Sequence, residues 1–137
     1  MELTIEQELR QGIAAHKDGK LQEAERFYLS ILKSKPTHTD ANHNMGVLLT
    51  GIGKFEEALP FFQKAISIDK KQEQYWISLI KTLIRLGKIG DARNILSEAI
   101  NSNVKGDKII SLSHQLNQST KLDFFYKFLK SVGIFNS

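Results

Sequence analysis

The chain has 137 residues, of which 41% are hydrophobic and 25% charged, a size and composition typical of a single folded domain. It contains no cysteine, which excludes disulfides and thiolate metal sites, and its net charge of +4 comes from lysines spread along the chain, which favours a solvated surface over a nucleic-acid interface. The sequence has no apolar run of about 18 residues for a membrane span and no secretory signal at its start, so we expect a cytoplasmic protein without membrane insertion.

In chain order, the sequence predicts alternating pairs of amphipathic helices. The first pair covers residues 5–18 and a helix that begins at Leu21, the second covers residues 39–52 and a helix from Phe55, and the third covers residues 73–86 and a helix from Ile89. Each second helix carries apolar residues three and four positions apart, which is the spacing of one helical stripe. Thr4 and Thr39 are expected N-caps because acidic residues follow them in the first turn.

A short pattern recurs between the two helices of each pair. It reads GKLQEA from Gly19, GKFEEA from Gly53 and GKIGDA from Gly87, so consecutive copies are 34 residues apart. A fixed period of this size indicates repeated supersecondary units. The repeated glycine is expected to end the first helix in a left-handed conformation, which costs a residue with a Cβ atom about 1 kcal/mol or more.

Small residues recur at the same period inside the helices. Ala24, Ala58 and Ala92 lie in the middle of the second helices, where a small side chain lets two backbones approach closely. Gly12 and Gly46 occupy corresponding positions in the first helices, and the third unit has Ile80 there. We therefore expect the third pair of helices to lie slightly farther apart than the other two.

These residues resemble the tetratricopeptide repeat, a helix–turn–helix unit of about 34 residues with small residues at fixed places in both helices. The units would be residues 5–38, 39–72 and 73–106. Trp76 matches the early tryptophan of the repeat, whereas Glu8 and Asn42 stand in its place in the first two units, and Leu96 replaces an aromatic residue. The resemblance implies an all-α fold, a right-handed α-solenoid within a single domain that spans residues 1–137.

Residues 107–133 lie beyond the third unit and lack its pattern. Ile109, Leu112 and Leu116 predict a seventh helix, and the stretch KLDFFYKFLKSVG predicts an eighth that ends near Gly133. Because the last unit of a solenoid leaves an apolar face uncovered, we interpret these as two C-terminal capping helices. The alternative is that Phe124, Phe128 and Phe135 stay exposed and form a secondary interface, to a partner or between two copies of the chain.

No catalytic or metal-binding pattern emerges from the sequence. Gly53 and Lys54 lack the spacing and the following Ser or Thr of a phosphate-binding loop, and His38 and His43 lack a third ligand at helical spacing. We therefore expect no enzyme activity, no cofactor and no metal.

In the family that the sequence resembles, the first helices of the units line a concave groove that binds peptides or helices. The positions carried over to this chain are Leu9, Arg10, Ile13, Lys17, His43, Asn44, Val47, Ile77, Ser78, Lys81 and Arg85. Asn44 matches an asparagine that holds the backbone of a bound peptide, and the alternative is that it bonds to a neighbouring turn. Leu9 and Ile13 stand where chaperone-binding members have the Lys and Asn of a carboxylate clamp.

The resemblance therefore implies a non-catalytic protein-interaction module whose groove takes a peptide or helical segment with acidic groups. Two alternatives remain at this stage. The chain is an N-terminal accessory domain of a larger transferase-type enzyme, or it is a scaffold that associates with itself through its Phe-rich C-terminal helix.

Overall fold

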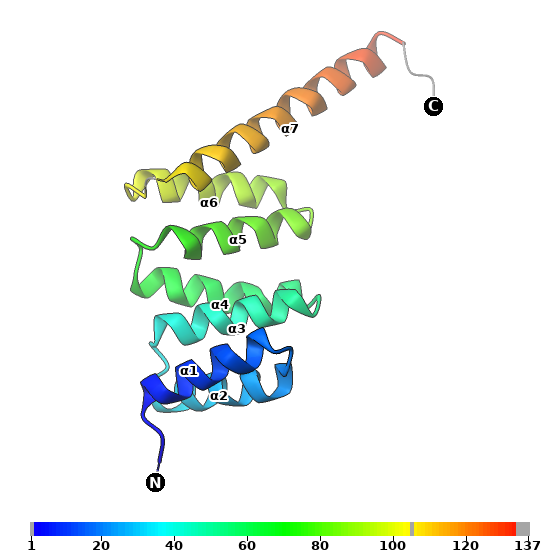
Figure 1. The fold of residues 1–137 in the computed structure, drawn as a ribbon. Helices are drawn as coiled ribbons and strands as arrows, with labels where there is room; N and C mark the ends of the chain where they lie inside the picture. Colours follow the sequence, from blue (N-terminus) through cyan, green and yellow to red (C-terminus); the bar gives the residue numbers. More distant parts are fainter. Residues whose placement is uncertain (1, 105, 134–137) are drawn as a thin grey trace. The chain divides into compact units, whose positions relative to one another are not determined.

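The computed structural model describes residues 2–104 and 106–133, with side chains described throughout except at 118–127. Over these residues the chain forms α-helices and turns, and Figure 1 shows the helices in sequence order. The helices are α1 (Ile5–Lys17), α2 (Leu21–Ser34), α3 (Thr39–Gly51), α4 (Phe55–Ile68), α5 (Glu73–Arg85), α6 (Ile89–Asn101) and α7 (Asp107–Ser131).

The chain divides into two compact units, Met1–Val104 and Lys105–Ser137. The first unit contains three antiparallel helix pairs, α1–α2, α3–α4 and α5–α6, and each pair packs on the next through α2 with α3 and α4 with α5. This stacking of equivalent pairs is an α-solenoid, which confirms the predicted fold (Figure 1). The predicted helix boundaries differ from the observed ones by about one residue.

The three glycine turns are nearly identical. Gly19, Gly53 and Gly87 have φ of +77°, +81° and +75°, which confirms the predicted left-handed conformation. In each turn the lysine that follows donates its backbone N–H to a carbonyl five residues earlier: from Lys20 to Ala15, from Lys54 to Leu49 and from Lys88 to Leu83, all at 2.9 Å. These bonds satisfy carbonyls that the helix end leaves without an intrahelical partner.

The helix starts agree with the sequence in one case and differ in another. Thr4 caps α1 with a full capping box, in which its hydroxyl accepts from Gln7 N–H and the Gln7 side chain accepts from Thr4 N–H. The prediction that Thr39 caps the next unit is wrong, because Thr39 is the first residue of α3 and His38 is the cap. The imidazole Nδ1 of His38 accepts from Ala41 N–H at 3.1 Å, so histidine does here what a hydroxyl usually does.

Inside each of the first two pairs, a glycine faces an aromatic ring. A Cβ atom built on Gly12 would lie 2.8 Å from Tyr28 Cε1, and one built on Gly46 would lie 2.5 Å from Phe62 Cε1. In the third pair the equivalent residues are Ile80 and Leu96, both buried. Consistent with the larger residue at position 80, α5 and α6 are in less extensive close backbone contact than the other two pairs.

The residue at the tryptophan position anchors the turn that enters its repeat. Trp76 Nε1 donates to the carbonyl oxygen of Lys70 at 2.8 Å. Asn42, one repeat earlier, donates its Nδ2 to the carbonyl oxygen of Pro36 at 3.1 Å, and Pro36 is the repeat equivalent of Lys70. Asn42 therefore departs from the family pattern in size but keeps its hydrogen bond.

The second unit differs from the prediction. A single helix, α7, runs from Asp107 to Ser131, where we expected two helices. The residues between the two predicted helices, NQST at 117–120, include no glycine or proline, so nothing in the backbone chemistry stops the first helix. The predicted end is confirmed, since Gly133 has φ of +81° just past the last turn. The role of this unit as a cap stays a prediction.

We expect the Gly46→Ala substitution to lower the free energy of unfolding by about 1–3 kcal/mol, because the new methyl group would overlap the Phe62 ring. Adding Phe62→Leu, which recreates the type of pair found in the third repeat, should recover part of that loss. Urea unfolding of the two single variants and the double variant gives the coupling energy.

Gly90→Ala is the matched control for this prediction, because a Cβ atom there would meet nothing within 4 Å. It lies in α6, and removing a helical glycine without a clash is expected to stabilise the protein by about 0.5–1 kcal/mol. Equal effects of Gly46→Ala and Gly90→Ala would contradict the role of the ring contact.

Candidate functional site

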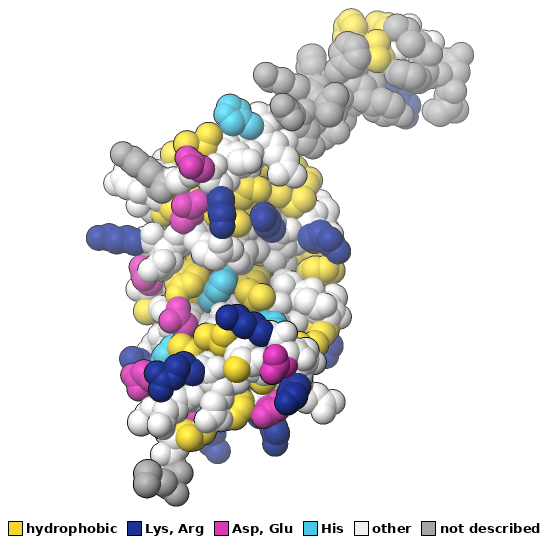
Figure 2. All heavy atoms as spheres, viewed as in Figure 1, with side chains coloured by type: hydrophobic (Ala, Val, Ile, Leu, Met, Phe, Trp, Pro, Cys, Tyr) yellow, Lys and Arg dark blue, Asp and Glu magenta, His cyan; other side chains and the backbone are white. Residues whose placement is uncertain are grey.

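The first helices of the three pairs, α1, α3 and α5, contact one another in sequence order along the first unit. We call the solvent-facing side of these helices the inner face. Figure 2 shows Lys and Arg side chains (dark blue) distributed over this face, with Asp and Glu (magenta), hydrophobic and histidine side chains between them. Its residues are Leu9, Arg10, Ile13 and Lys17 from α1, Asp40, His43, Asn44 and Val47 from α3, and Gln74, Ser78, Lys81 and Arg85 from α5.

Ten of the eleven groove residues expected from the sequence have solvent-accessible side chains. The cations Arg10, Lys17, Lys81 and Arg85 are exposed, and Leu9, Ile13, His43, Asn44, Val47 and Ser78 are half-buried. Ile77 is only 1% exposed, so the expectation that its side chain lines the groove is wrong. It lies in α5, which also buries Tyr75, Trp76 and Leu79 and therefore leaves less of its surface to solvent than α1 does.

His43 occupies the contact between the second and third repeats. Its Nε2 lies 2.8 Å from Ser78 Oγ, a hydrogen bond that joins α3 to α5. The imidazole ring also packs against two aromatic rings, with centroid distances of 4.9 Å to Tyr75 and 5.5 Å to Phe62. Ser78 in turn accepts a hydrogen bond from Gln74 Nε2 at 3.3 Å. These contacts hold the imidazole in one orientation on the inner face.

Burial lowers the pKa of His43 below its ordinary value of 6.5. The negative charge of Asp40 and the side-chain hydrogen bond with Asn44 act in the opposite direction, and burial has the larger effect. His43 is therefore neutral at pH 7. Asn44 takes part in this cluster through its bond to His43, whereas its contact to a ligand stays a prediction.

Sequence reasoning missed Tyr75 and its bond to Asp40. The Tyr75 hydroxyl donates to Asp40 Oδ1 at 2.8 Å, and burial is the main cause that raises the pKa of Tyr75 above 10.0. Asp40 and Tyr75 are 35 residues apart, as are His43 and Ser78. In an array with a period of 34, this separation places two residues side by side across a repeat boundary. The separation was therefore the feature of the sequence that could have indicated these two bonds.

The cations at the C-terminal end of α5 differ in how firmly they are held. The Arg85 guanidinium lies 5.1 Å from the centroid of the Phe55 ring, a cation–π contact between α5 and the start of α4. Lys81, one turn earlier in α5, is exposed. Arg85 therefore presents a positioned planar cation, and Lys81 presents a more adaptable one.

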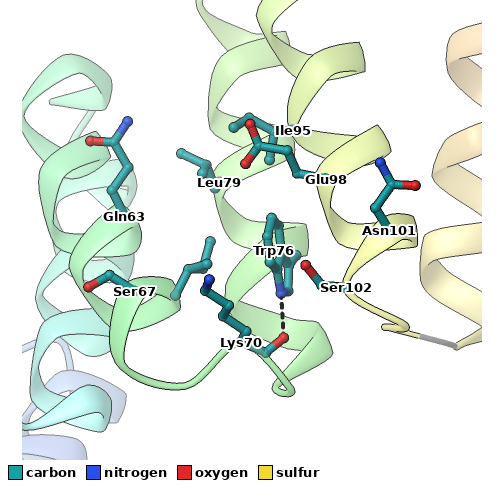
Figure 3. Close-up of a pocket in the computed structure, with 10 residues that line it drawn as sticks. Gln63, Ser67, Lys70, Trp76, Leu79, Ile95, Glu98, Asn101 and Ser102 are labelled. Atoms are coloured by element: carbon teal, nitrogen blue, oxygen red, sulfur yellow. Dashed lines mark hydrogen bonds between the residues drawn. The ribbon is translucent and has the colours of Figure 1, made fainter.

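A separate pocket lies between α4, α5 and α6, away from the inner face (Figure 3). Its volume is about 470 Å³, and Trp76, Leu79 and Ile66 form its buried apolar floor. Polar side chains surround this floor, including Lys70 and Glu98. The indole N–H of Trp76 is already used by the Lys70 carbonyl, so this floor offers mainly apolar contact.

The described residues include no cluster of three His, Asp or Glu side chains that could hold a metal ion. Among their helices, none is both long and apolar enough to cross a membrane.

The secondary interface expected in the C-terminal segment falls largely outside the described side chains. Phe128, on α7, is 53% exposed, and Val132 beyond it is 55% exposed. The Phe124 side chain and the whole of Phe135 lie outside the described residues.

Comparison with known proteins agrees with the repeat architecture. The sequence model of the tetratricopeptide repeat matches residues 53–112. Curated proteins yield no match to this sequence. Among solved structures, a complex of the TPR2B domain of yeast Sti1 with pHsp70 is similar with a TM-score of 0.72 and 20% identity, covering 84% of this chain and 97% of that chain.

Two other similar structures have different contexts. The first TPR of Spaghetti (RPAP3), bound to the HSP90 peptide SRMEEVD, has a TM-score of 0.73 and 15% identity and covers 83% of this chain and 90% of that chain. A mutant O-GlcNAc transferase of Thermobaculum terrenum has a TM-score of 0.65 and 22% identity, covering 74% of this chain and only 20% of that chain. At these identities the similarity shows a shared fold.

We predict that His43 makes the protein less stable as the pH falls. Its pKa is lowered in the folded state, so the unfolded chain takes up the proton more readily, and the free energy of unfolding decreases below about pH 6.5. Urea unfolding at pH 7.5 and pH 5.5 should show a larger loss for the wild type than for His43→Gln, which has no proton to gain. Parallel pH profiles of the two proteins would contradict the prediction.

Proposed function

Because the chain belongs to the tetratricopeptide-repeat family, we propose that its inner face binds a peptide or helical segment of a partner protein without catalysing a reaction. The ligand combines apolar side chains with acidic groups. This proposal depends on one observation above all, the arrangement of exposed cations beside half-buried apolar side chains on α1, α3 and α5.

The charge on the inner face favours an acidic partner. Four cations on α1 and α5, Arg10, Lys17, Lys81 and Arg85, are exposed, and they outnumber the exposed acidic residues Glu6 and Asp40 on the same side. Charge of one sign on a binding surface speeds the approach of an oppositely charged ligand and disfavours ligands of the same charge.

The apolar part of the face supplies the contact area. Leu9, Ile13 and Val47 are half-buried, so each leaves part of its side chain available to a ligand. Burying apolar surface contributes about 25 cal/mol per Å², and an apolar ligand residue set against these three side chains would gain from that burial. A peptide with alternating apolar and acidic residues would match both features.

The similar structures support this type of ligand. Sti1 TPR2B is solved in complex with pHsp70, and the first TPR of Spaghetti is solved with a peptide that contains two glutamates and an aspartate. The positions of Leu9 and Ile13, however, carry a Lys and an Asn in members that clamp a terminal carboxylate. We therefore propose that α1 contributes apolar contact and that acidic groups bind chiefly at α5.

A second candidate is self-association through the C-terminal segment, which the exposure of Phe128 and Val132 favours. Sedimentation equilibrium over a range of protein concentrations tests it. A mass that stays monomeric throughout would rule out this candidate, and a mass that rises with concentration and returns to monomer with Phe128→Ser would support it.

For the main proposal, we predict that a peptide selected from a random displayed library by the wild-type protein binds at least about tenfold more weakly to Lys81→Glu/Arg85→Glu. The reversal removes two attractive charges and introduces two repulsive ones, and tenfold corresponds to about 1.4 kcal/mol. Titration calorimetry measures the dissociation constants, and circular dichroism verifies that the helices are retained.

The matched control is Lys64→Glu/Lys71→Glu, which makes the same charge change at exposed positions in α4 and in the turn after it. Its affinity for the peptide should stay within about twofold of the wild type, apart from a small long-range effect that salt screens. Equal affinity of the wild type and the Lys81/Arg85 variant would show that the peptide binds elsewhere and would overturn the proposal.

A further inference from the structure

We propose that His43 is a specificity-determining contact of the inner face, where its neutral imidazole contacts an apolar side chain of the bound segment. Binding there releases the proton from those molecules in which His43 is protonated. This inference rests on the proposed function. It adds the chemistry of one contact in the middle of the face and a dependence of affinity on pH.

The geometry makes the imidazole a fixed part of the binding surface. Its Nε2 is bonded to Ser78 Oγ at 2.8 Å, and its ring packs against Tyr75 and Phe62. The side chain is half-buried, so a ligand lying across α3 and α5 would cover the part that solvent still reaches. Because these contacts already fix the ring, ligand binding does not have to immobilise it, which saves conformational entropy.

The charges around His43 determine what kind of ligand group suits it. On its own helix the acidic group is Asp40, which acts on it electrostatically, and α5 contributes the Tyr75 phenol, which donates to Asp40. From α4 it is packed by the uncharged ring of Phe62. The ionisable residues of α1 on the same side, Glu6, Arg10 and Lys17, are exposed to solvent.

Asp40 therefore makes the surroundings of His43 unfavourable for a second carboxylate. The cations Lys81 and Arg85 lie three and seven residues beyond Ser78 along α5, so acidic ligand groups have a better place at that end of the helix. This division leaves the surface over His43 to an uncharged, apolar side chain.

Covering the imidazole in this way changes its proton affinity. An apolar side chain would displace the water that still reaches the ring, and loss of water disfavours the charged form of histidine. The complex then holds the proton more weakly than the free protein does. By linkage, the affinity for the ligand must decrease when the pH falls low enough to protonate His43 in the free protein, whose pKa burial already lowers below the ordinary value of 6.5.

The test uses the library-selected peptide described above. Calorimetry at pH 6.0 in two buffers of different ionisation enthalpy gives the number of protons released on binding. We expect the wild type to release a fraction of one proton and to bind the peptide about two- to tenfold more weakly at pH 5.5 than at pH 7.5. His43→Gln should release less and show a correspondingly smaller change in affinity, while His114→Gln, altered at an exposed histidine of α7, should behave as the wild type does.

Peptide binding with the same proton release in the wild type and His43→Gln would overturn this inference and leave the proposed function intact. Proton uptake that depends on His43 would also overturn it, since it would mean that an acidic group of the peptide lies on the imidazole. Failure of the protein to select any peptide that is sensitive to Lys81→Glu/Arg85→Glu would overturn the proposed function and this inference together.

Discussion

The close approach of two helices within a repeat is the constraint on which the rest of the structure depends. At Gly12 and Gly46 the backbone of one helix touches the aromatic ring of its partner, and there is no room for even a methyl group. That contact sets the separation and rotation of the first two pairs, and therefore decides which side chains point away from the partner helix. The inner face is made of those remaining side chains. Its chemistry can vary because the contacts at Gly12 and Gly46, and not these side chains, set how closely the helices approach.

The third pair solves the same packing problem with different residues. Ile80 and Leu96 replace the glycine and the ring. The first helix of the pair therefore carries a larger side chain than in the other pairs, and the second helix carries a smaller one. Asn42 and Trp76 show a similar exchange, since both donate to equivalent carbonyl oxygens although one side chain is far larger than the other. In both cases the repeats keep the same contact, either the packing of two helices or the hydrogen bond to the turn, while the residue types that make the contact change.

This explains which features the sequence predicted well. Helix boundaries and glycine turns follow from local backbone chemistry that recurs every 34 residues, and they were predicted to within about one residue. The single long α7 was missed because an apolar stripe shows where a helix fits and says little about whether two stripes are joined. The burial of Ile77 was missed because one residue's exposure depends on every neighbouring helix. The His43–Ser78 and Asp40–Tyr75 bonds were missed because they join different repeats, although their common separation of 35 residues was legible.

The short reach of these cross-repeat bonds also bears on how the first unit folds. The bonds between α3 and α5 span 35 residues, and the packing contacts join each helix to its neighbours along the chain. A chain held together by contacts of such low sequence separation closes only short loops as it folds, which favours rapid folding. It also means that one pair can form first and serve as the surface on which the next pair assembles, in either direction along the chain.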